Sequence, residues 1–331
     1  MTNIIGRIED WVRAGRKSTP ERISWAEDYV KSEMLAATRA NFIPSIAAEP
    51  RPSITLSSHF YCPRSLWLKR NGKDVEDVAP RVYNNFQSGR AAECSINTRS
   101  ILCGLPLLSP RFGTSSQARF WLSLPSGELR GSMDHILAAE LMDKPFATRE
   151  ELEAYEAAKR PIIICDVKAM QDRSFDSSVA PLFGERLKEF NDEHTHLRAS
   201  PGDLRVGNKF GYEDQLRNYA TAAEDAGFRV ESLWFLIHKK STGHEAQIPC
   251  PLPDAAHRAR ISEALRVATS DPLPPRPSWA TVKVVRAPGG AVEQIEDVRC
   301  GYCACRAACW PGFEQKVVSG KPVYRRPLEV V

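Results

Sequence analysis

Cysteine placement is the feature that most restricts how this chain of 331 residues can fold. A cluster near the C-terminal end contains Cys300, Cys303, Cys305 and Cys309, and Cys62 stands far upstream in the sequence YCPR. The chain has nine cysteines, an odd number that fits metal ligands and buried thiols better than a disulfide framework. Four of these thiols match the ligand set of an iron–sulfur cluster or a structural zinc site. The spacing therefore predicts that a metal centre joins the two ends of the fold.

The spacing favours iron–sulfur over zinc. Zinc ribbons usually pair two short Cys-x2-Cys knuckles, whereas here the lone Cys62 combines with a triplet of Cys300, Cys303 and Cys309. We interpret Cys305 as a spare that can replace Cys303 or Cys309. Closing a loop of roughly 240 residues restricts the unfolded chain by on the order of 5 kcal/mol. We therefore expect the centre to stabilise the fold rather than to perform chemistry.

A short apolar run, IIICDVKAM, follows Pro161 and is typical of a buried central strand. Upstream, residues 118–138 alternate in polarity around a turn signal at 125–127 and predict a β-hairpin. Downstream, a helix closed by Gly227 precedes a second apolar strand, VESLWFLIHKK. This order predicts an α/β fold with a central mixed sheet flanked by helices.

The chain divides into four expected segments. They are a helical N-terminal appendage at 1–50, a first cluster-ligand helix with a basic patch at 51–80, a core at 81–247 with insertions at 140–160 and 171–210, and a C-terminal helix, cysteine cluster and tail at 248–331. No run of about 18 apolar residues is present, and the N-terminus lacks the features of a targeting peptide. We therefore expect a cytoplasmic protein with no membrane partner.

Three carboxylates and a lysine suggest hydrolytic chemistry. Asp166 and Lys168 are two apart on the apolar strand, so their side chains share one face. Asp134 ends the sequence GSMD in the hairpin region, and Glu93 lies on the preceding predicted helix. Phosphodiester hydrolysis needs an activated water and neutralisation of developing charge, tasks suited to oxygen-ligated Mg²⁺ or Mn²⁺ beside an ammonium. The three carboxylates are the predicted ligands, with the carbonyl of Val167 completing the shell.

The motif order resembles that of the RecB-type nucleases of the PD-(D/E)XK superfamily. The matching motifs are Gly89 to Glu93, Gly131 to Asp134, Asp166 with Lys168, and Gln215 with Tyr219. The resemblance covers about residues 55–312 and implies a restriction-endonuclease-like core. It implies catalytic roles for the set Glu93, Asp134, Asp166, Lys168, Gln215 and Tyr219. Many iron–sulfur members have histidine where this chain has Glu93, which is instead similar to phage lambda exonuclease and leaves the choice between magnesium and manganese open.

The cysteine pattern resembles that of the iron–sulfur subclass of these nucleases, which includes AddB and the CRISPR-associated adaptation exonucleases. The resemblance implies a structural 4Fe-4S cluster on Cys62, Cys300, Cys303 and Cys309. It further implies a metal-dependent DNA exonuclease, acting 5′ to 3′ on single strands or DNA ends, in recombination, repair or spacer processing. Implied partners are DNA, a recombination or CRISPR-adaptation protein, or a second copy of the chain.

A basic patch follows Cys62, where Arg64, Lys69 and Arg70 lie on one short predicted helix with aromatic residues between them. Basic groups beside stacking platforms suit single-stranded DNA, and the alternative is a solvated face over core aromatics. Other functions also fit the sequence. They are an endonuclease or flap nuclease of the same fold, a catalytically silent DNA-binding or redox-sensing iron–sulfur protein, and a zinc-binding scaffold.

Overall fold

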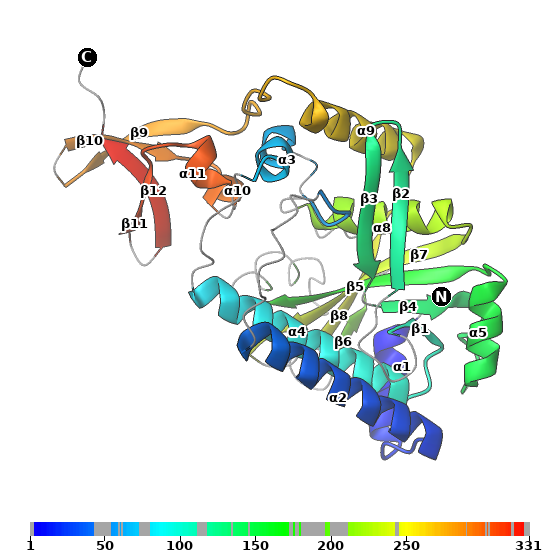
Figure 1. Ribbon diagram of the computed structural model, residues 1–331. Helices are drawn as coiled ribbons and strands as arrows, with labels where there is room; N and C mark the ends of the chain where they lie inside the picture. Colours follow the sequence, from blue (N-terminus) through cyan, green and yellow to red (C-terminus); the bar gives the residue numbers. More distant parts are fainter. Residues whose placement is uncertain are drawn as a thin grey trace.

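The computed structural model describes most of the chain and shows a mixed α/β architecture (Figure 1). The described residues are 3–42, 54–58, 60, 62–72, 80–110, 118–133, 135–144, 146–171, 175, 179, 196–198, 211–241, 245–288, 290–301, 303, 305–318 and 321–327. Within them, no helix is long and apolar enough to cross a membrane.

A six-stranded mixed sheet lies at the centre, in the order β1-β4-β5-β7-β8-β6. The strands are β1 (Leu107–Ser109), β4 (His135–Ala138), β5 (Ile162–Met170), β7 (Val230–Lys239), β8 (Glu245–Cys250) and β6 (His196–Arg198). β5 pairs with β7 in parallel and with β4 antiparallel, so the expected mixed sheet is confirmed. The apolar residues that predicted β5 are buried along its first half, as a strand covered on both faces requires.

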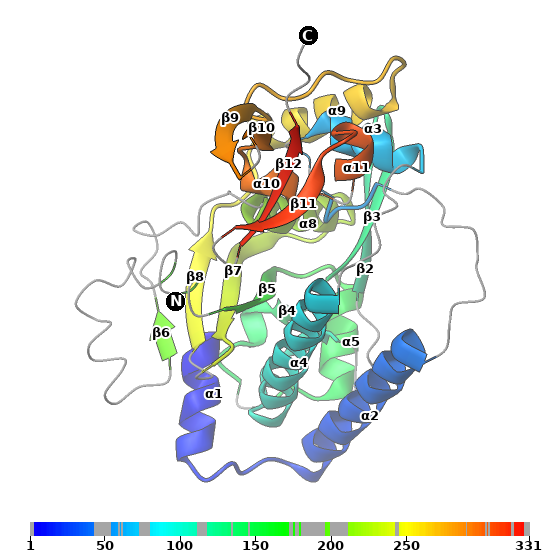
Figure 2. The ribbon, with the colours of Figure 1, turned by 90° about the vertical axis from the view of Figure 1, so that its left-hand side faces the viewer.

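Helices cover both faces of the sheet (Figures 1 and 2). One layer consists of α1 (Ile4–Arg13), α2 (Pro20–Phe42) and α4 (Pro80–Leu102), and its core includes Ile163 and Cys165 of β5. The other layer contains α8 (Tyr212–Asp225), α9 (Ala255–Thr269) and the hairpin of β2 (Ala118–Leu124) and β3 (Gly127–Met133), and its core includes Ile162 and Ile164. Because side chains alternate along a strand, the even-numbered residues of β5 face α8.

The N-terminal helices share the core of the sheet. Ile4, Ile5 and Tyr29 belong to the same buried cluster as the odd-numbered residues of β5. At the start of α1, the backbone N–H groups of Ile4 and Ile5 donate to Gln247 Oε1 on β8, at 3.0 and 3.3 Å. This side chain satisfies donors that the first turn of a helix leaves free. The segment expected as an appendage is thus docked onto the sheet edge.

Of the two expected insertions, the structure describes nearly all of 140–160 and only a small part of 171–210. Residues 140–160 contain most of the short 3-10 helix Ala139–Leu141 and all of α5 (Arg149–Ala157), which begins with a capping box between Thr148 and Glu151. Most of the 171–210 insertion lies outside the described residues.

The C-terminal region adds a small sheet that the sequence analysis did not predict. Its order is β11-β12-β10-β9, with antiparallel neighbours. The strands are β9 (Val282–Ala287), β10 (Gly290–Ile295), β11 (Glu314–Val318) and β12 (Lys321–Pro327). Figure 2 shows this sheet beside α3 (Pro63–Arg70), α10 (Val298–Gly301) and α11 (Arg306–Cys309). The arrangement brings Cys62, which precedes α3, close to the C-terminal cysteines.

Candidate functional site

An ion pair on β5 forms the centre of the candidate site. Asp166 is 2% exposed, and its Oδ2 lies 2.8 Å from Lys168 Nζ. Although this distance defines an ion pair, Asp166 Oδ2 accepts no hydrogen bond of good geometry from the described residues. The Lys168 ammonium already offsets part of the desolvation cost of this buried carboxylate. Asp166 is thus a buried oxygen donor of the type that hard cations bind.

A hydrogen-bonded chain on α8 positions the lysine. Lys168 Nζ donates to Gln215 Oε1 at 3.3 Å, and Gln215 Nε2 donates to Tyr219 OH at 3.1 Å. The ring of Tyr212 lies beneath the same ammonium, with 4.8 Å between Nζ and the ring centroid. Burial raises the pKa of the Tyr212 hydroxyl, so the ring stays neutral. The structure thus groups the sequence-predicted residues Asp166, Lys168, Gln215 and Tyr219.

Tyr212 was not predicted from the sequence, although a signal was present. Positions 212, 215 and 219 are spaced by three and four residues, which places them on one face of a helix. The aromatic ring adds a cation–π contact to Lys168. The spacing identifies the shared face, but the position of Lys168 over that face depends on tertiary packing.

Gly131 connects the hairpin to this site. A Cβ atom at position 131 would lie 2.8 Å from Tyr219 Cε1 and 2.9 Å from Leu56 Cβ. These distances are well inside normal carbon contacts of about 3.5–4.0 Å. The absence of a side chain at Gly131 therefore lets β3 approach Tyr219, which explains physically why glycine occurs in the Gly131-to-Asp134 motif.

The other two predicted carboxylates have different outcomes. Asp134 lies outside the described residues, but the next residue, His135, pairs with Cys165, the neighbour of Asp166. Glu93 lies on α4, in the layer that covers the opposite face of the sheet from Asp166. The structure therefore does not show Glu93 and Asp166 at one shared centre.

A buried polar network anchors α4 at the start of β4. Asn97 Oδ1 lies 2.7 Å from His135 Nδ1, and Asn97 Nδ2 donates to Tyr29 OH at 3.1 Å. Burial lowers the pKa of His135 to about 3, so its ring is neutral near pH 7. This network fixes one turn of α4, immediately after Glu93, against the central sheet.

The fit to a divalent cation is partial. Within the described part of the chain, no group of three or more His, Cys, Asp or Glu side chains is arranged to hold a metal ion. Asp134 is not among those residues. Asp166 supplies one buried carboxylate, which is paired with Lys168, and the carbonyl of Val167 is adjacent to it in sequence.

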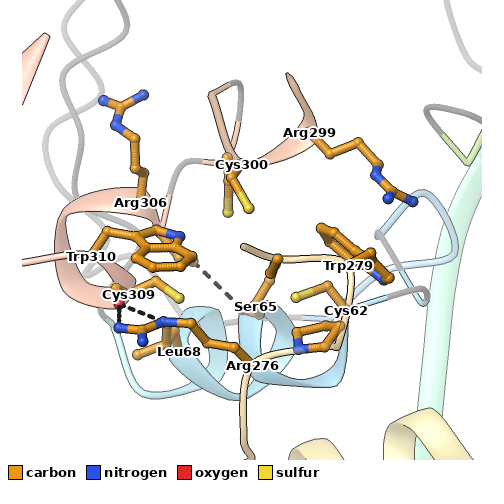
Figure 3. Close-up of a pocket in the computed structure, with 14 residues that line it drawn as sticks. Cys62, Ser65, Leu68, Arg276, Trp279, Arg299, Cys300, Arg306, Cys309 and Trp310 are labelled. Atoms are coloured by element: carbon orange, nitrogen blue, oxygen red, sulfur yellow. Dashed lines mark hydrogen bonds between the residues drawn. The ribbon is translucent and has the colours of Figure 1, made fainter. Parts of the chain in front are cut away.

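Five cysteines line a cavity of about 30 Å³ between α3 and the C-terminal helices (Figure 3). They are Cys62, Cys300, Cys303, Cys305 and Cys309. This volume exceeds the roughly 10–15 Å³ that one water needs. Figure 3 shows Cys62, Cys300 and Cys309 directed toward the same central space. No three of these described cysteines are arranged to hold a single metal ion, and zinc would need its sulfurs at about 2.3 Å.

Two thiols of this cavity, Cys62 and Cys300, favour the protonated form when no metal is bound. Burial, followed by the neighbouring cysteines, raises the pKa of Cys62 to about 12. Burial also raises the pKa of Cys300 to about 11, opposed by a hydrogen bond with the Trp310 side chain. A bound metal centre deprotonates its thiol ligands, so binding here is coupled to proton release. Cys305 instead donates to the carbonyl of Ser65 at 3.5 Å, which fits its interpretation as a spare.

Arginines around the same cavity provide positive charge. Arg276, Arg299 and Arg306 all line it. The guanidinium of Arg276 lies 3.9 Å from the ring centroid of Trp310, and that of Arg299 lies 3.7 Å from the ring centroid of Trp279. These aromatic contacts hold the cations in place. Guanidinium groups that line the cavity would offset part of the negative charge of thiolate ligands, although Arg299 is also paired with Asp297 at 2.7 Å.

The basic patch of α3 has structural contacts. Arg64 donates to the carbonyl of Pro274 at 2.7 Å, and Arg70 donates to that of Thr269 at 3.0 Å. Between them, Trp67 Nε1 donates to the carbonyl of Ser270 at 3.0 Å. These three bonds fasten α3 to the end of α9 and the segment after it. DNA binding by Arg64, Arg70 and the half-buried Lys69 stays a prediction.

Comparisons with known proteins do not add a family. No protein-family profile matches this chain, and neither characterised proteins nor solved structures give a significant match. The β5 ion pair and the cysteine-lined cavity are the two features of the described structure that point to a function.

Proposed function

We propose that this chain is a metal-dependent deoxyribonuclease of the PD-(D/E)XK type. The observation that carries the proposal is the buried Asp166–Lys168 ion pair, whose carboxylate oxygen accepts no hydrogen bond from the described residues. Its position next to Gln215 and Tyr219 matches the motif set that predicted this activity. We favour an exonuclease that acts 5′ to 3′ on DNA ends or single strands, with an endonuclease or flap nuclease as the alternative.

Each residue has a physical role in the proposed reaction. A bound Mg²⁺ or Mn²⁺ ion would supply an activated water and neutralise charge developing on the phosphate. Asp166, with Asp134, would hold the ion, whereas Glu93 lies on α4 against the opposite face of the sheet and is left out of this ligand set. Lys168 offers its ammonium to the phosphate, while Gln215 keeps this group oriented.

The cysteine-lined cavity would hold a 4Fe-4S cluster through Cys62, Cys300, Cys303 and Cys309. The shared cavity, its buried and half-buried thiols and the surrounding arginines support this part of the proposal. The role of the cluster would be structural, because it would connect α3 with the C-terminal region across most of the chain. Its loss is expected to loosen α3, whose Arg64 and Trp67 hold the segment after α9.

The chain contains a matched control for a test of Lys168. Glu314 and Lys316 form the same acid-x-lysine pattern on strand β11, with an ion pair of 2.8 Å. The side chains of Lys316 and Glu314 are 57% and 73% exposed, whereas those of Lys168 and Asp166 are 18% and 3% exposed. The two pairs therefore share sequence pattern and distance but differ in burial.

The test is hydrolysis of end-labelled DNA with Mg²⁺ or Mn²⁺ by the wild type, Lys168→Ala and Lys316→Ala. We expect Lys168→Ala to lose about 100-fold or more in rate, as for loss of a charge-stabilising group, and Lys316→Ala to retain activity. Circular DNA beside linear DNA separates endonuclease from exonuclease activity. A wild type that cleaves no DNA, or a Lys168→Ala variant as fast as the wild type, would overturn the proposal.

A further inference from the structure

The hairpin of β2 and β3 has an exposed face that the candidate site does not use. Its other face is buried, where Phe120, Leu122 and Leu129 pack into the core with α8. Phe120 makes an edge-to-face contact with Phe228, with 5.8 Å between ring centroids. The segment before α3 also joins the hairpin, because Leu56 N donates to the carbonyl of Arg130 at 3.0 Å. The exposed face is therefore carried on a well-fixed scaffold.

Trp121 lies on this exposed face. Its side chain is 48% exposed, whereas the other six tryptophans of the chain are buried or half-buried. Several others have their indole N–H bonded to a protein oxygen, as in Trp67 with Ser270 and Trp11 with Lys17. Leaving a large aromatic side chain in water forgoes the stabilisation that burial gives. Exposure on a rigid strand therefore suggests contact with a ligand.

Two arginines flank the tryptophan. Arg130 is the direct cross-strand partner of Trp121, and Arg119 precedes it by two residues on the same face. Both arginine side chains are exposed, and neither forms an ion pair with another described residue. The acidic residue of this face, Glu128, lies further toward the hairpin turn, opposite Ser123. The positive charge is thus concentrated at the half of the hairpin nearer the candidate site.

The hairpin leads directly to that site. β3 ends at Met133, and β4 starts at His135, opposite Cys165 and next to Asp166. At about 3.4 Å per residue, Arg130 lies roughly 10 Å along the strand from Met133. This distance corresponds to a few nucleotides of a strand, since stacked nucleotides rise about 3.4 Å each. The exposed face is opposite the one that contacts Tyr219 through Gly131, so a strand bound at the candidate site would reach it by passing the edge of the hairpin.

We propose that Arg119, Trp121 and Arg130 form a binding platform for single-stranded nucleic acid, on which Trp121 stacks an unpaired base while the arginines contact the flanking phosphates. Aromatic stacking combined with positive charge is the recurring chemistry of single-strand recognition. This inference deepens the proposed function, because it assigns the path of the strand that leads to the catalytic residues. The competing explanation for the exposed Trp121 is that its contact with Arg130 across the strands only stabilises the hairpin.

The test is equilibrium binding of a fluorescein-labelled single strand about 20 nucleotides long, with EDTA present, followed by fluorescence anisotropy. We expect Trp121→Ala to weaken binding by about 5-fold or more, and Trp121→Phe to retain most of it because the ring remains. Phe146→Ala is the matched control, since Phe146 is also an exposed aromatic residue, 38% exposed, and belongs to the segment before α5 rather than to the hairpin. A blunt duplex should show a smaller effect of Trp121→Ala, because its bases are already stacked.

The arginines are tested by the salt dependence of the same binding. The double variant of Arg119→Gln and Arg130→Gln should lower the slope of log K against log salt by about 1.4, from about 0.7 per phosphate contact on single strands. An unchanged slope would remove the arginines from the platform. Thermal unfolding of each variant shows whether the hairpin remains folded.

The outcomes separate this inference from the proposed nuclease function. If Trp121→Ala binds like the wild type while the wild type cleaves DNA, the platform is wrong and the nuclease proposal stands. If binding depends on Trp121 but no DNA is cleaved, the platform stands and the nuclease proposal falls. Wild-type protein that does not bind the single strand overturns the platform. Equal losses for Trp121→Ala and Phe146→Ala would do the same.

Discussion

Replacing Gly131 by alanine should destabilise the protein and disturb the candidate site. The new Cβ would lie 2.8 Å from Tyr219 Cε1 and 2.9 Å from Leu56 Cβ. Normal carbon contacts are about 3.5–4.0 Å, so the neighbours must move by roughly 0.6 Å or more. The Tyr219 ring must therefore move, and relief of the Leu56 contact requires a shift of the backbone that the Leu56–Arg130 hydrogen bond holds.

The expected cost follows from two contributions. Inserting a methyl group into a well-packed region costs about 1–3 kcal/mol. Movement of Tyr219 also breaks its hydrogen bond with Gln215, worth about 1 kcal/mol. The free energy of unfolding should therefore fall by about 2–4 kcal/mol. With an unfolding entropy of about 2.1 cal/mol/K per residue, this lowers Tm by roughly 3–6 °C.

The assay is thermal and urea unfolding of Gly131→Ala beside a matched Gly89→Ala control. Gly89 lies on α4 with no atom within 4 Å of a Cβ built there, so alanine should be neutral or stabilise the helix by up to about 1 kcal/mol. In a Tyr219→Ala background, the cost of Gly131→Ala should fall by about 1 kcal/mol or more. Equal stability of the two alanine variants, or additive costs in the double variant, would refute the packing argument.

Two further predictions concern the cysteine-lined cavity and a buried histidine. Cys300→Ala should lower both the iron content and Tm, because the proposed centre closes a long loop worth on the order of 5 kcal/mol. Cys305→Ala should keep its iron. Iron analysis and melting curves test this prediction, and iron-free wild-type protein would contradict it. Burial, followed by nearby arginines, lowers the pKa of His257 to about 4. The unfolded chain, with an ordinary pKa near 6.5, binds the extra proton, so the free energy of unfolding should fall by up to about 3 kcal/mol as pH drops from about 6.5 to 4. Urea titrations across this range should show a shallower loss for His257→Gln, and an equal slope would exclude His257 as the cause.

Much of the central fold was predictable from local sequence signals. Apolar runs identified β5 and β7, and the alternating pattern identified the hairpin of β2 and β3. The predicted hairpin extended to residue 138, whereas residues 135–138 form β4 of the central sheet. Helix ends were signalled by glycines in the left-handed region, as at Gly72 with φ of +66° and Gly227 with φ of +90°. These signals are local, so no knowledge of the packing was required.

The C-terminal sheet was missed because its strands have a weak pattern. β9 is half-exposed along its length and includes the charged residues Lys283 and Arg286, so its alternation does not stand out as a core strand. β1 and β6 have three residues each, too few to show a period. Their existence depends on hydrogen bonding to a neighbouring strand.

The candidate site was predictable to the extent that it depends on spacing within one element. Asp166 with Lys168, and Gln215 with Tyr219, each share a face because of the periods of strand and helix. Which layer Glu93 occupies depends on how α4 packs on the sheet, and spacing does not determine this. Sequence order alone therefore placed Glu93 with the other acids, whereas the structure puts it in the opposite layer.

The most direct test of the central claim is Mn²⁺ binding, measured by electron paramagnetic resonance on the wild type, Asp166→Asn and the control Glu314→Gln. We expect the wild type and Glu314→Gln to bind Mn²⁺ alike. Asp166→Asn should bind Mn²⁺ more than about 10-fold more weakly, because the buried oxygen of Asp166 is a proposed ligand. Asparagine keeps the size of the side chain, so packing is preserved. Equal Mn²⁺ affinity in Asp166→Asn and the wild type would contradict the proposed metal site at Asp166.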